Sequence, residues 1–419
     1  MAAWRNLRWW LVLCALGGSL PAHAKTDHFY PTAGDCAGLP RVQLKTPPGF
    51  CVGLATSGLK FPRGLAVLAD GTVLVAEMAG WVENKGRLLA LKPQGGAFAR
   101  EVLAEGLDRP HGVAIGPDGH VYIGVVGGVK RFALGADGAV PGAKPVLEDV
   151  IGGDSGVEPL PGKGRHPLTQ LVFGAPGQLF VSVGSASDHC ENDKDEPPAP
   201  DKPCVEASGD APFGVIREYR LDAQGKVTGW RMYARGLRNS MALAFHGESG
   251  QLWQGENSRD AIQRAMPELK DDEELPHDEL NRIEADGDYG WPYCYDDALA
   301  SPEYPHHDCG ATRKPHLLLP AHAAPLGMAF YRGQAFPEAL RNSLIVGYHG
   351  YRRYGHRLVA FPLNAAHAPE EPARELIGGW GKQAEQPLGA PVGVAVDRDG
   401  AIWITEDRNG TLLRLVYLH

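Results

Sequence analysis

The residue types best suited to chemistry stand directly before a set of similar apolar segments. His166 precedes one such segment, and Arg238 and Asn239 precede the next. An imidazole accepts and releases a proton near neutral pH, so we predict His166 as a general base. Arginine offers paired donors to carboxylates, so Arg238 and Asn239 are predicted to bind an anionic, planar ligand and to polarise a carbonyl. The alternatives are a histidine hydrogen-bonded beneath a loop and an arginine that braces a loop carboxylate.

An acidic stretch further along is a candidate metal site. Asp278 and Glu279 precede Leu280-Asn281 and the turn at 286–292. Carboxylates and turn carbonyls at this density suit Ca²⁺, which takes about 6–8 oxygen ligands. The spacing is not that of an EF-hand, and a solvated acidic loop is the alternative.

Two arginines form a third candidate cluster. Arg352 and Arg353 follow the segment 348–351, and Arg357 lies just beyond them. Such a group could bind the carboxylates of a ligand. Surface charges paired across strands are the alternative.

Six copies of one phrase supply the elements that must position these residues. Each copy has a small residue, three apolar residues, a polar turn and an alternating strand. The copies are 64–77, 112–125, 170–183, 242–256, 327–348 and 393–406. The turn dipeptides between half-buried strands predict a β-hairpin in each copy. Because one hairpin cannot bury its apolar face alone, we predict an all-β fold, a six-bladed β-propeller with long inter-blade loops. A β-sandwich is the alternative.

A propeller of this kind gathers the residues before each copy at the mouth of its central channel. Loops that enter the innermost strands meet there, so these side chains should face one pocket. Besides those above, the residues in this position are Arg63, Arg109-Pro110-His111, Arg165, Pro325-Leu326 and Pro391-Val392.

The first 24 residues predict a secretory signal peptide. Arg5 and Arg8 precede an apolar stretch, and 22–24 reads Ala-His-Ala, the pattern of a cleavage site. The stretch is shorter than the ~20 residues of a spanning helix, so an uncleaved anchor is the less favoured alternative. We therefore expect one propeller domain over 25–419, with no membrane span after cleavage, in the periplasm or outside the cell.

Charge and cysteine usage agree with export. The chain has 41 Lys and Arg against 50 Asp and Glu, with no basic run, which argues against nucleic acid as a partner. Seven cysteines, of which Cys14 lies in the predicted signal, leave six with 15 possible pairings. Bridges between neighbours are the simplest choice in an oxidising compartment. They are Cys36–Cys51, Cys190–Cys204 and Cys294–Cys309.

Several phrases resemble the soluble quinoprotein sugar dehydrogenases, the glucose/sorbosone dehydrogenase family that uses pyrroloquinoline quinone (PQQ). The phrases are PRGLAVLADGTVLVAE, HPLTQLVFGAPGQLFVSVGS, GLRNSMALAF, DELNRI with DYGWPYCY, HAAPLGMAFY with LIVGYHG, and PVGVAVDRDG with ITEDRNG. They occur in the family's order, and the chain is most similar to the sorbosone-dehydrogenase branch.

The resemblance implies a PQQ- and Ca²⁺-dependent dehydrogenase of an aldose or a related sugar or aldehyde. His166 would remove the hydroxyl proton as hydride passes to the quinone. Arg238 would polarise the quinone carbonyl, and Asn239 would line the same pocket. Electrons would leave to an external acceptor, a quinone or a cytochrome, because the chain has no C-x-x-C-H haem motif.

The resemblance also implies where the cofactors bind. Ca²⁺ would be held by backbone carbonyls of the segment Gly255, Glu256 and Asn257, and PQQ carboxylates by Arg352 or Arg353. Gln170 replaces an arginine common in relatives, and the segment 351–353 replaces their S-W-N-R, which leaves the binding arginine open.

Two other function classes remain open on the residues alone. One is a metal-dependent hydrolase resembling the lactonase-type propellers, and the other is a non-catalytic propeller that binds a carbohydrate or a protein. The Arg, His and Asn residues predicted at the channel mouth favour an anionic cofactor over a bare metal.

Overall fold

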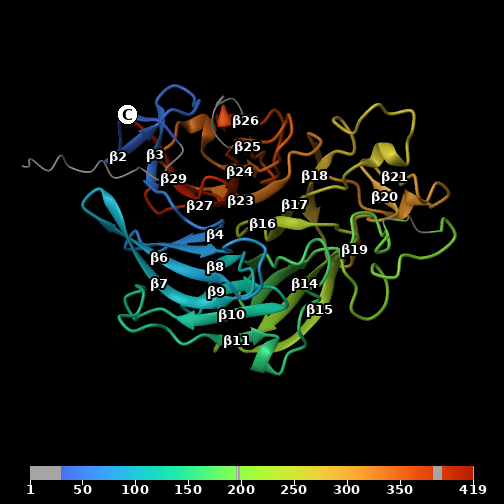
Figure 1. The fold of residues 1–419 in the computed structure, drawn as a ribbon, viewed down its shortest axis with the longest axis horizontal. Coiled ribbons are helices and arrows are strands. Elements are labelled where there is room, and N and C mark those ends of the chain that lie inside the picture. Colours follow the sequence, from blue (N-terminus) through green and yellow to red (C-terminus); the bar gives the residue numbers. More distant parts are fainter. Residues whose placement is uncertain (1–29, 195, 197–198, 381–388, 419) are drawn as a thin grey trace, which may run out of the picture.

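Six antiparallel sheets follow one another around a central axis in chain order (Figure 1). This computed structural model describes residues 30–194, 196, 199–380 and 389–418. The predicted signal peptide at 1–24 lies outside the described residues. Each sheet contains one of the six repeated phrases as its two innermost strands, which confirms the predicted six-bladed β-propeller.

The first three blades are built from consecutive strands. Blade 1 contains β4 (Pro62–Val67), β5 (Val73–Glu77), β6 (Gly86–Gln94) and β7 (Ala97–Leu107). Blade 2 contains β8 (Val113–Ile115), β9 (His120–Val125), β10 (Gly128–Ala133) and β11 (Glu148–Ile151). Blade 3 contains β12 (Leu171–Phe173), β13 (Gln178–Val183), β14 (Val215–Leu221) and β15 (Val227–Arg235), with β19 (Gly287–Asp288) added in parallel at its edge.

The remaining blades complete the ring. Blade 4 contains β16 (Ser240–His246), β17 (Gln251–Glu256), β18 (Asp278–Ile283) and β22 (Leu317–Leu319). Blade 5 contains β23 (Pro325–Tyr331), β24 (Ser343–Tyr348), β25 (Arg357–Pro362) and β26 (Arg374–Ile377). Blade 6 contains β27 (Pro391–Val396), β28 (Ile402–Glu406) and β29 (Thr411–Tyr417).

Strands from near both ends of the chain close the ring. β3 (Phe50–Thr56) pairs with β29 as the fourth strand of blade 6, and β2 (Leu39–Val42) and β1 (Thr32–Cys36) extend the same sheet. β27 lies beside β4 of blade 1, so the last blade packs on the first (Figure 1). Backbone hydrogen bonds between distant parts of the chain thereby replace a free sheet edge.

The core lies between neighbouring blades. Trp253 of blade 4 is 1% exposed and packs in one cluster with Leu344 and Val346 of blade 5. All five residues of β5 are buried, because an inner strand is covered on both faces by adjacent blades. Burial of a large apolar side chain stabilises the fold by roughly 1.5–3 kcal/mol. The apolar residues that alternate along the repeated phrases are therefore the residues through which neighbouring blades pack.

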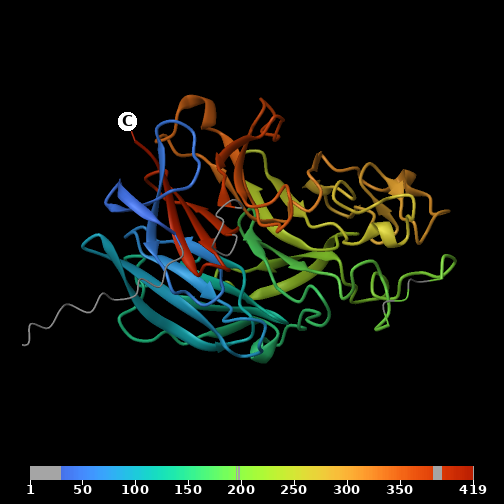
Figure 2. The same ribbon diagram turned by 45° about the horizontal axis from the view of Figure 1, so that its top comes forward.

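Three disulfides are present, one in the sheet of blade 6 and two in the long loops attached to blades 3 and 4. The bonds Cys36–Cys51, Cys190–Cys204 and Cys294–Cys309 are all present, which confirms the three predicted pairings. The loop that carries β20 (Cys294–Tyr295) and β21 (Leu299–Ala300) projects from the ring beside the Cys190–Cys204 loop (Figure 2), and the two are joined where the Cys204 N–H donates to the Tyr293 hydroxyl at 2.8 Å.

The helices within the described residues are four short 3₁₀ segments. They are η1 (Gly153–Ser155), η2 (Ile262–Arg264), η3 (Cys309–Ala311) and η4 (Glu338–Leu340). None of the helices in that part of the chain is long and apolar enough to cross a membrane.

Candidate active site

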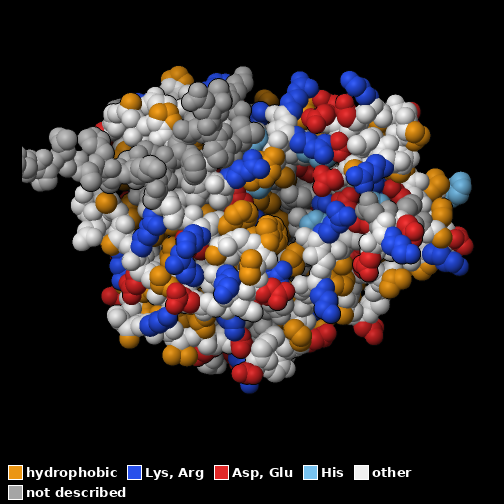
Figure 3. All heavy atoms as spheres, in the orientation of Figure 1, with side chains coloured by type: hydrophobic (Ala, Val, Ile, Leu, Met, Phe, Trp, Pro, Cys, Tyr) orange, Lys and Arg blue, Asp and Glu red, His pale blue; other side chains and the backbone are white. Residues whose placement is uncertain are grey.

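Two adjoining cavities lie at one end of the inner strands, with volumes of about 300 Å³ and about 310 Å³. They share His166, Asn239, His349 and Tyr351 as lining residues. One face of the molecule is hollowed near its middle, and basic and histidine side chains gather around the hollow (Figure 3). An antiparallel hairpin starts and ends at the same end of its blade, so loops before first strands and after second strands meet here.

His166 reaches the cavities from the loop before β12 of blade 3. Its Nδ1 lies 2.8 Å from the Ser185 hydroxyl and 3.1 Å from the Ser185 carbonyl oxygen. The Ser185 hydroxyl donates its own proton to the Ser187 carbonyl at 2.6 Å. Nδ1 must then be the donor, which leaves the lone pair on Nε2. Burial, followed by the nearby Arg238 guanidinium, lowers the pKa of His166 to about 3, so the ring is a neutral base at ordinary pH.

Arg238 is buried and held by acceptors on two segments. Its Nε donates to the Asp188 carbonyl oxygen at 3.1 Å, its Nη1 donates to the Asn257 carbonyl oxygen at 2.8 Å, and its Nη2 pairs with the Asp188 carboxylate. Burial opposes the charged form of Arg238, but the Asp188 carboxylate outweighs it and the pKa of Arg238 is raised. The guanidinium charge at the cavity wall is therefore fixed in place before any ligand arrives.

Asn239, Asn257 and Asp278 bring oxygen atoms to the same wall. Asn239 Oδ1 is buried and has no hydrogen-bond partner among the described residues. The Asn257 amide donates to the Pro325 carbonyl oxygen at 2.9 Å. The Asp278 carboxylate accepts from the backbone N–H groups of Ser258 at 2.8 Å and Ala324 at 2.6 Å. Burial raises the pKa of Asp278 to about 6.

The side chains of two predicted metal ligands point away from the mouth cavities. Glu256 and Glu279 alternate with Asn257 and Asp278 along the chain, and they line a third cavity of about 30 Å³ that shares Arg238 and Ser258 with the first. Glu256 accepts from the Asn239 N–H at 2.8 Å and from the Gln254 amide at 2.5 Å. Burial raises the pKa of Glu256 to about 7 and the pKa of Glu279 well above its usual range. Gly255 lines neither mouth cavity, and its strand packs against Pro325.

The structure separates the two candidate arginines of blade 5. Arg352 lines the first cavity and pairs with Asp272 at 2.5 Å. Arg353 has a side chain 68% exposed, pairs with Glu274 at 3.0 Å and lines neither cavity. Gln170 also lies away from the mouth, since it lines the central channel and its amide donates to the Met241 carbonyl oxygen at 3.0 Å.

A second charged cluster on the cavity wall, centred on Asp407, was not predicted from the sequence. Asp407 pairs with Arg63 at 2.6 Å and with His349 at 3.1 Å, and it accepts from the Tyr351 hydroxyl at 3.3 Å. Burial would raise the pKa of Asp407, but His349 and Arg63 hold it below its usual range. Arg408 stacks over the Tyr351 ring at 4.0 Å. The sequence signal was present, because Arg63 precedes the first copy and Asp407 directly follows the last.

The donor set fits an anionic planar cofactor. The cavities have the 300–1,000 Å³ scale of small-molecule sites, with cationic side chains at Arg63, Arg238 and Arg352. Phe61, Leu168 and Met241 provide an apolar wall in the second cavity. The unpartnered Asn239 oxygen adds a polar group for which a ligand would supply the missing partner.

Comparison with known proteins identifies relatives for most of the chain. The sequence model described as Glucose / Sorbosone dehydrogenase matches residues 157–414. A curated, uncharacterised protein of Borreliella burgdorferi is 28% identical over 191 residues, 44% of this chain, and the match spans about half of the relative, 48%.

Solved structures share the fold. An enzyme of carbohydrate-active family AA12 from Trichoderma reesei has a TM-score of 0.69 and 21% identity, over 93% of this chain and 98% of its own. The PQQ domain of a pyranose dehydrogenase from Coprinopsis cinerea, in its holo form, has a TM-score of 0.69 and 18% identity, over 91% and 99%. The soluble aldose sugar dehydrogenase of Escherichia coli, in its apo form, has a TM-score of 0.60 and 18% identity, over 88% and 99%.

Proposed function

The chain belongs to the glucose/sorbosone dehydrogenase family, and from this premise we propose that it is a PQQ-dependent dehydrogenase of an aldose or related sugar or aldehyde. The observation that carries the proposal is the neutral His166 beside the fixed Arg238 cation in one mouth cavity. A base and a cation in one pocket suit the removal of a hydride from an alcohol.

His166 performs the proton step in this proposal. With Nδ1–H directed to Ser185, Nε2 accepts the proton of a substrate hydroxyl placed in the cavity. The oxygen gains electron density as the proton leaves, which makes the adjacent carbon a better hydride donor. The lowered pKa keeps His166 unprotonated over the whole neutral range, so the Nε2 lone pair is free.

The cationic side chains bind and orient the cofactor. Arg352 and Arg63 would hold its carboxylates, and Arg238 would face its carbonyl region. Asn257 and Asp278 would supply oxygen ligands to Ca²⁺ on the cavity side of blade 4. When bound, PQQ would supply the hydride-accepting quinone and Ca²⁺ the Lewis acid beside it.

The compartment and the electron acceptor are part of the same proposal. Three disulfides and the signal-like residues 1–24 support a periplasmic or secreted protein. The absence of a C-x-x-C-H motif from the sequence supports an external quinone or cytochrome as electron acceptor.

The test is reconstitution of the purified chain with PQQ and Ca²⁺. We expect stoichiometric quinone absorbance that survives gel filtration, and reduction of an artificial acceptor dye by members of a sugar panel. Apo protein and protein treated with a chelator are the controls. Failure to retain the quinone, together with metal-dependent cleavage of lactones, would replace this proposal with a hydrolase.

A further inference from the structure

We propose that Glu206, tethered by the Cys190–Cys204 disulfide, is a positioning residue that selects the Nδ1–H tautomer of His166. Its kinetic consequence rests on the proposed function, whereas its structural consequence concerns the apo chain alone. Glu206 does not line either mouth cavity. It acts on His166 through Ser187 and Ser185.

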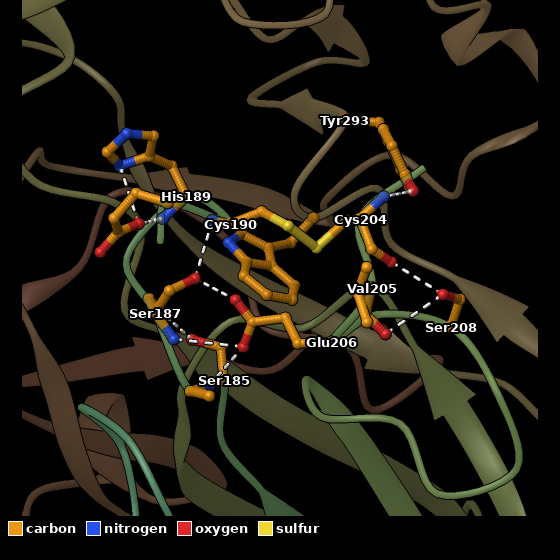
Figure 4. The surroundings of a disulfide bond; sticks show 12 residues. Ser185, Ser187, His189, Cys190, Cys204, Val205, Glu206, Ser208 and Tyr293 are labelled. Carbon is orange, nitrogen blue, oxygen red and sulfur yellow. Dashed lines mark hydrogen bonds and ion pairs between the residues drawn. A yellow bond between two sulfur atoms is a disulfide. The ribbon is translucent and has the colours of Figure 1, made fainter. Parts of the chain in front are cut away.

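The Glu206 carboxylate organises the loop after β13 (Figure 4). One oxygen accepts from the backbone N–H groups of Ala186 at 2.6 Å and Ser187 at 3.1 Å. The other accepts from the Ser187 hydroxyl, and the Ser187 hydroxyl in turn accepts from the Cys190 N–H at 2.8 Å. An ionised carboxylate only accepts hydrogen bonds, so the direction of each of these bonds is fixed.

The position of Ser187 sets the direction of the hydrogen bond between Ser185 and His166. Because Glu206 holds the backbone of Ser187, the Ser187 carbonyl stays within 2.6 Å of the Ser185 hydroxyl and takes its proton. The Ser185 oxygen can then only accept from His166 Nδ1, at 2.8 Å. Loss of the Ser187 carbonyl position would free the Ser185 proton to donate to Nδ1. The Ser185 carbonyl oxygen, at 3.1 Å, would then be the remaining acceptor that favours Nδ1–H, and the Nε2–H form would become populated.

The disulfide restrains Glu206 from the other side. Cys204 stands two residues before Glu206, and Cys190 stands three residues after Ser187, so the bond joins the two segments that the carboxylate bridges. The Cys204 N–H also donates to the Tyr293 hydroxyl at 2.8 Å. A partly exposed carboxylate is thus kept against the loop by a covalent link.

The test is Glu206→Gln, because the amide replaces one acceptor oxygen by a donor and keeps the size. Glu196→Gln is the matched control, since Glu196 lies within the loop that the Cys190–Cys204 bond closes, is exposed, and among the described residues is hydrogen-bonded only to Asn192. Thermal unfolding establishes that each variant is folded.

The first readout is the ¹⁵N spectrum of His166 in the apo protein, assigned with His166→Gln. We expect the Nδ1–H signature in the native chain and in Glu196→Gln, and a mixture or the Nε2–H form in Glu206→Gln. If Glu206→Gln does not fold, Ser187→Ala removes the hydroxyl link alone. It should shift the tautomer in the same direction by a smaller amount, because the Ala186 and Ser187 N–H groups still donate to Glu206. An Nδ1–H signature retained in the folded variant overturns the proposal.

The second readout is turnover of the PQQ-loaded protein. We expect kcat of Glu206→Gln to fall about tenfold, with the sugar KM and PQQ retention unchanged, because a general base in the wrong tautomer loses part of its contribution. An equal loss in Glu196→Gln, or a change in KM alone, counts against a role through His166. If the native chain shows no PQQ-dependent turnover, the proposed function fails, and the ¹⁵N spectrum still decides the role of Glu206.

Discussion

Buried acids at the channel mouth and in the small cavity lined by Glu256 and Glu279 lie in opposite electrostatic surroundings. At the channel mouth, Asp188 is paired with the Arg238 guanidinium, which outweighs burial and lowers the pKa of Asp188. In the small cavity between blades 3 and 4, Glu256 contacts the neutral Gln254 amide, and burial raises its pKa to about 7. Asn281 bridges the network by donating to Gln254 and Glu279.

The difference follows from the partners that each cavity provides. Side chains alternate along β17 and β18, so neighbouring residues point to opposite faces. At the mouth, the Arg238 guanidinium lowers the pKa of Asp188 and keeps it ionised, whereas Asp278, which accepts two backbone N–H bonds, has its pKa raised to about 6 by burial. The inner face meets amides, and its acids are stabilised in their protonated form.

Removal of the His166 imidazole at the channel mouth should have the largest effect on turnover. His166→Ala should lower kcat by about 10²–10⁴-fold, because a positioned general base contributes on that scale. PQQ retention should persist, since the arginines remain. His306→Ala, an exposed histidine, is the control and should leave turnover unchanged. Turnover of His166→Ala close to the native rate would remove His166 from the mechanism.

The next effect concerns the paired charges themselves. Arg238→Met leaves the Asp188 carboxylate buried without its cation, which should cost about 3–5 kcal/mol in the free energy of unfolding. Arg353→Met breaks an exposed pair and should cost under about 1 kcal/mol. Urea unfolding measures both. Similar losses of unfolding free energy in the two variants would show that burial does not increase the cost of breaking the Arg238–Asp188 pair.

The inter-blade side predicts a pH dependence of stability. The pKa of Glu256 is raised to about 7 in the folded chain, above the usual value near 4.3. The stabilisation is fully present below about pH 4 and is lost as pH rises through 7, by up to about 4 kcal/mol. Urea unfolding at pH 5 and pH 8 should show a smaller pH difference in Glu256→Gln than in the native chain. An equal difference would assign the dependence to other acids.

The smallest expected effect is on the pH dependence of kcat/KM, which reports the surroundings of His166 at the mouth. Because the pKa of His166 is lowered to about 3, titration of this ring should not reduce kcat/KM between pH 7 and pH 5. The measurement is the pH profile of kcat/KM in the reconstituted protein, with PQQ occupancy checked at each pH. An acid limb near pH 6.5 that is absent from the residual activity of His166→Ala would show an unperturbed imidazole.

Short-range pattern in the sequence was enough for the blades and the disulfides. Six copies of an apolar hairpin phrase required six sheets, and neighbouring cysteines formed the three bonds. Both depend on residues close in sequence, whose spacing sets the strand alternation and the loop length. The position of His166, Arg238 and Asn239 before the inner strands likewise placed them at the common mouth.

Only the tertiary structure decided which charged residues meet. Asp407 and Arg63 are 344 positions apart and pair because the last blade closes on the first. Asp188 and Arg238 are 50 positions apart and meet because the loop after β13 of blade 3 lies against the segment before β16 of blade 4. Burial and the partners from other blades, which no local spacing specifies, set each pKa and divided Asp278 from Glu279 onto different cavities.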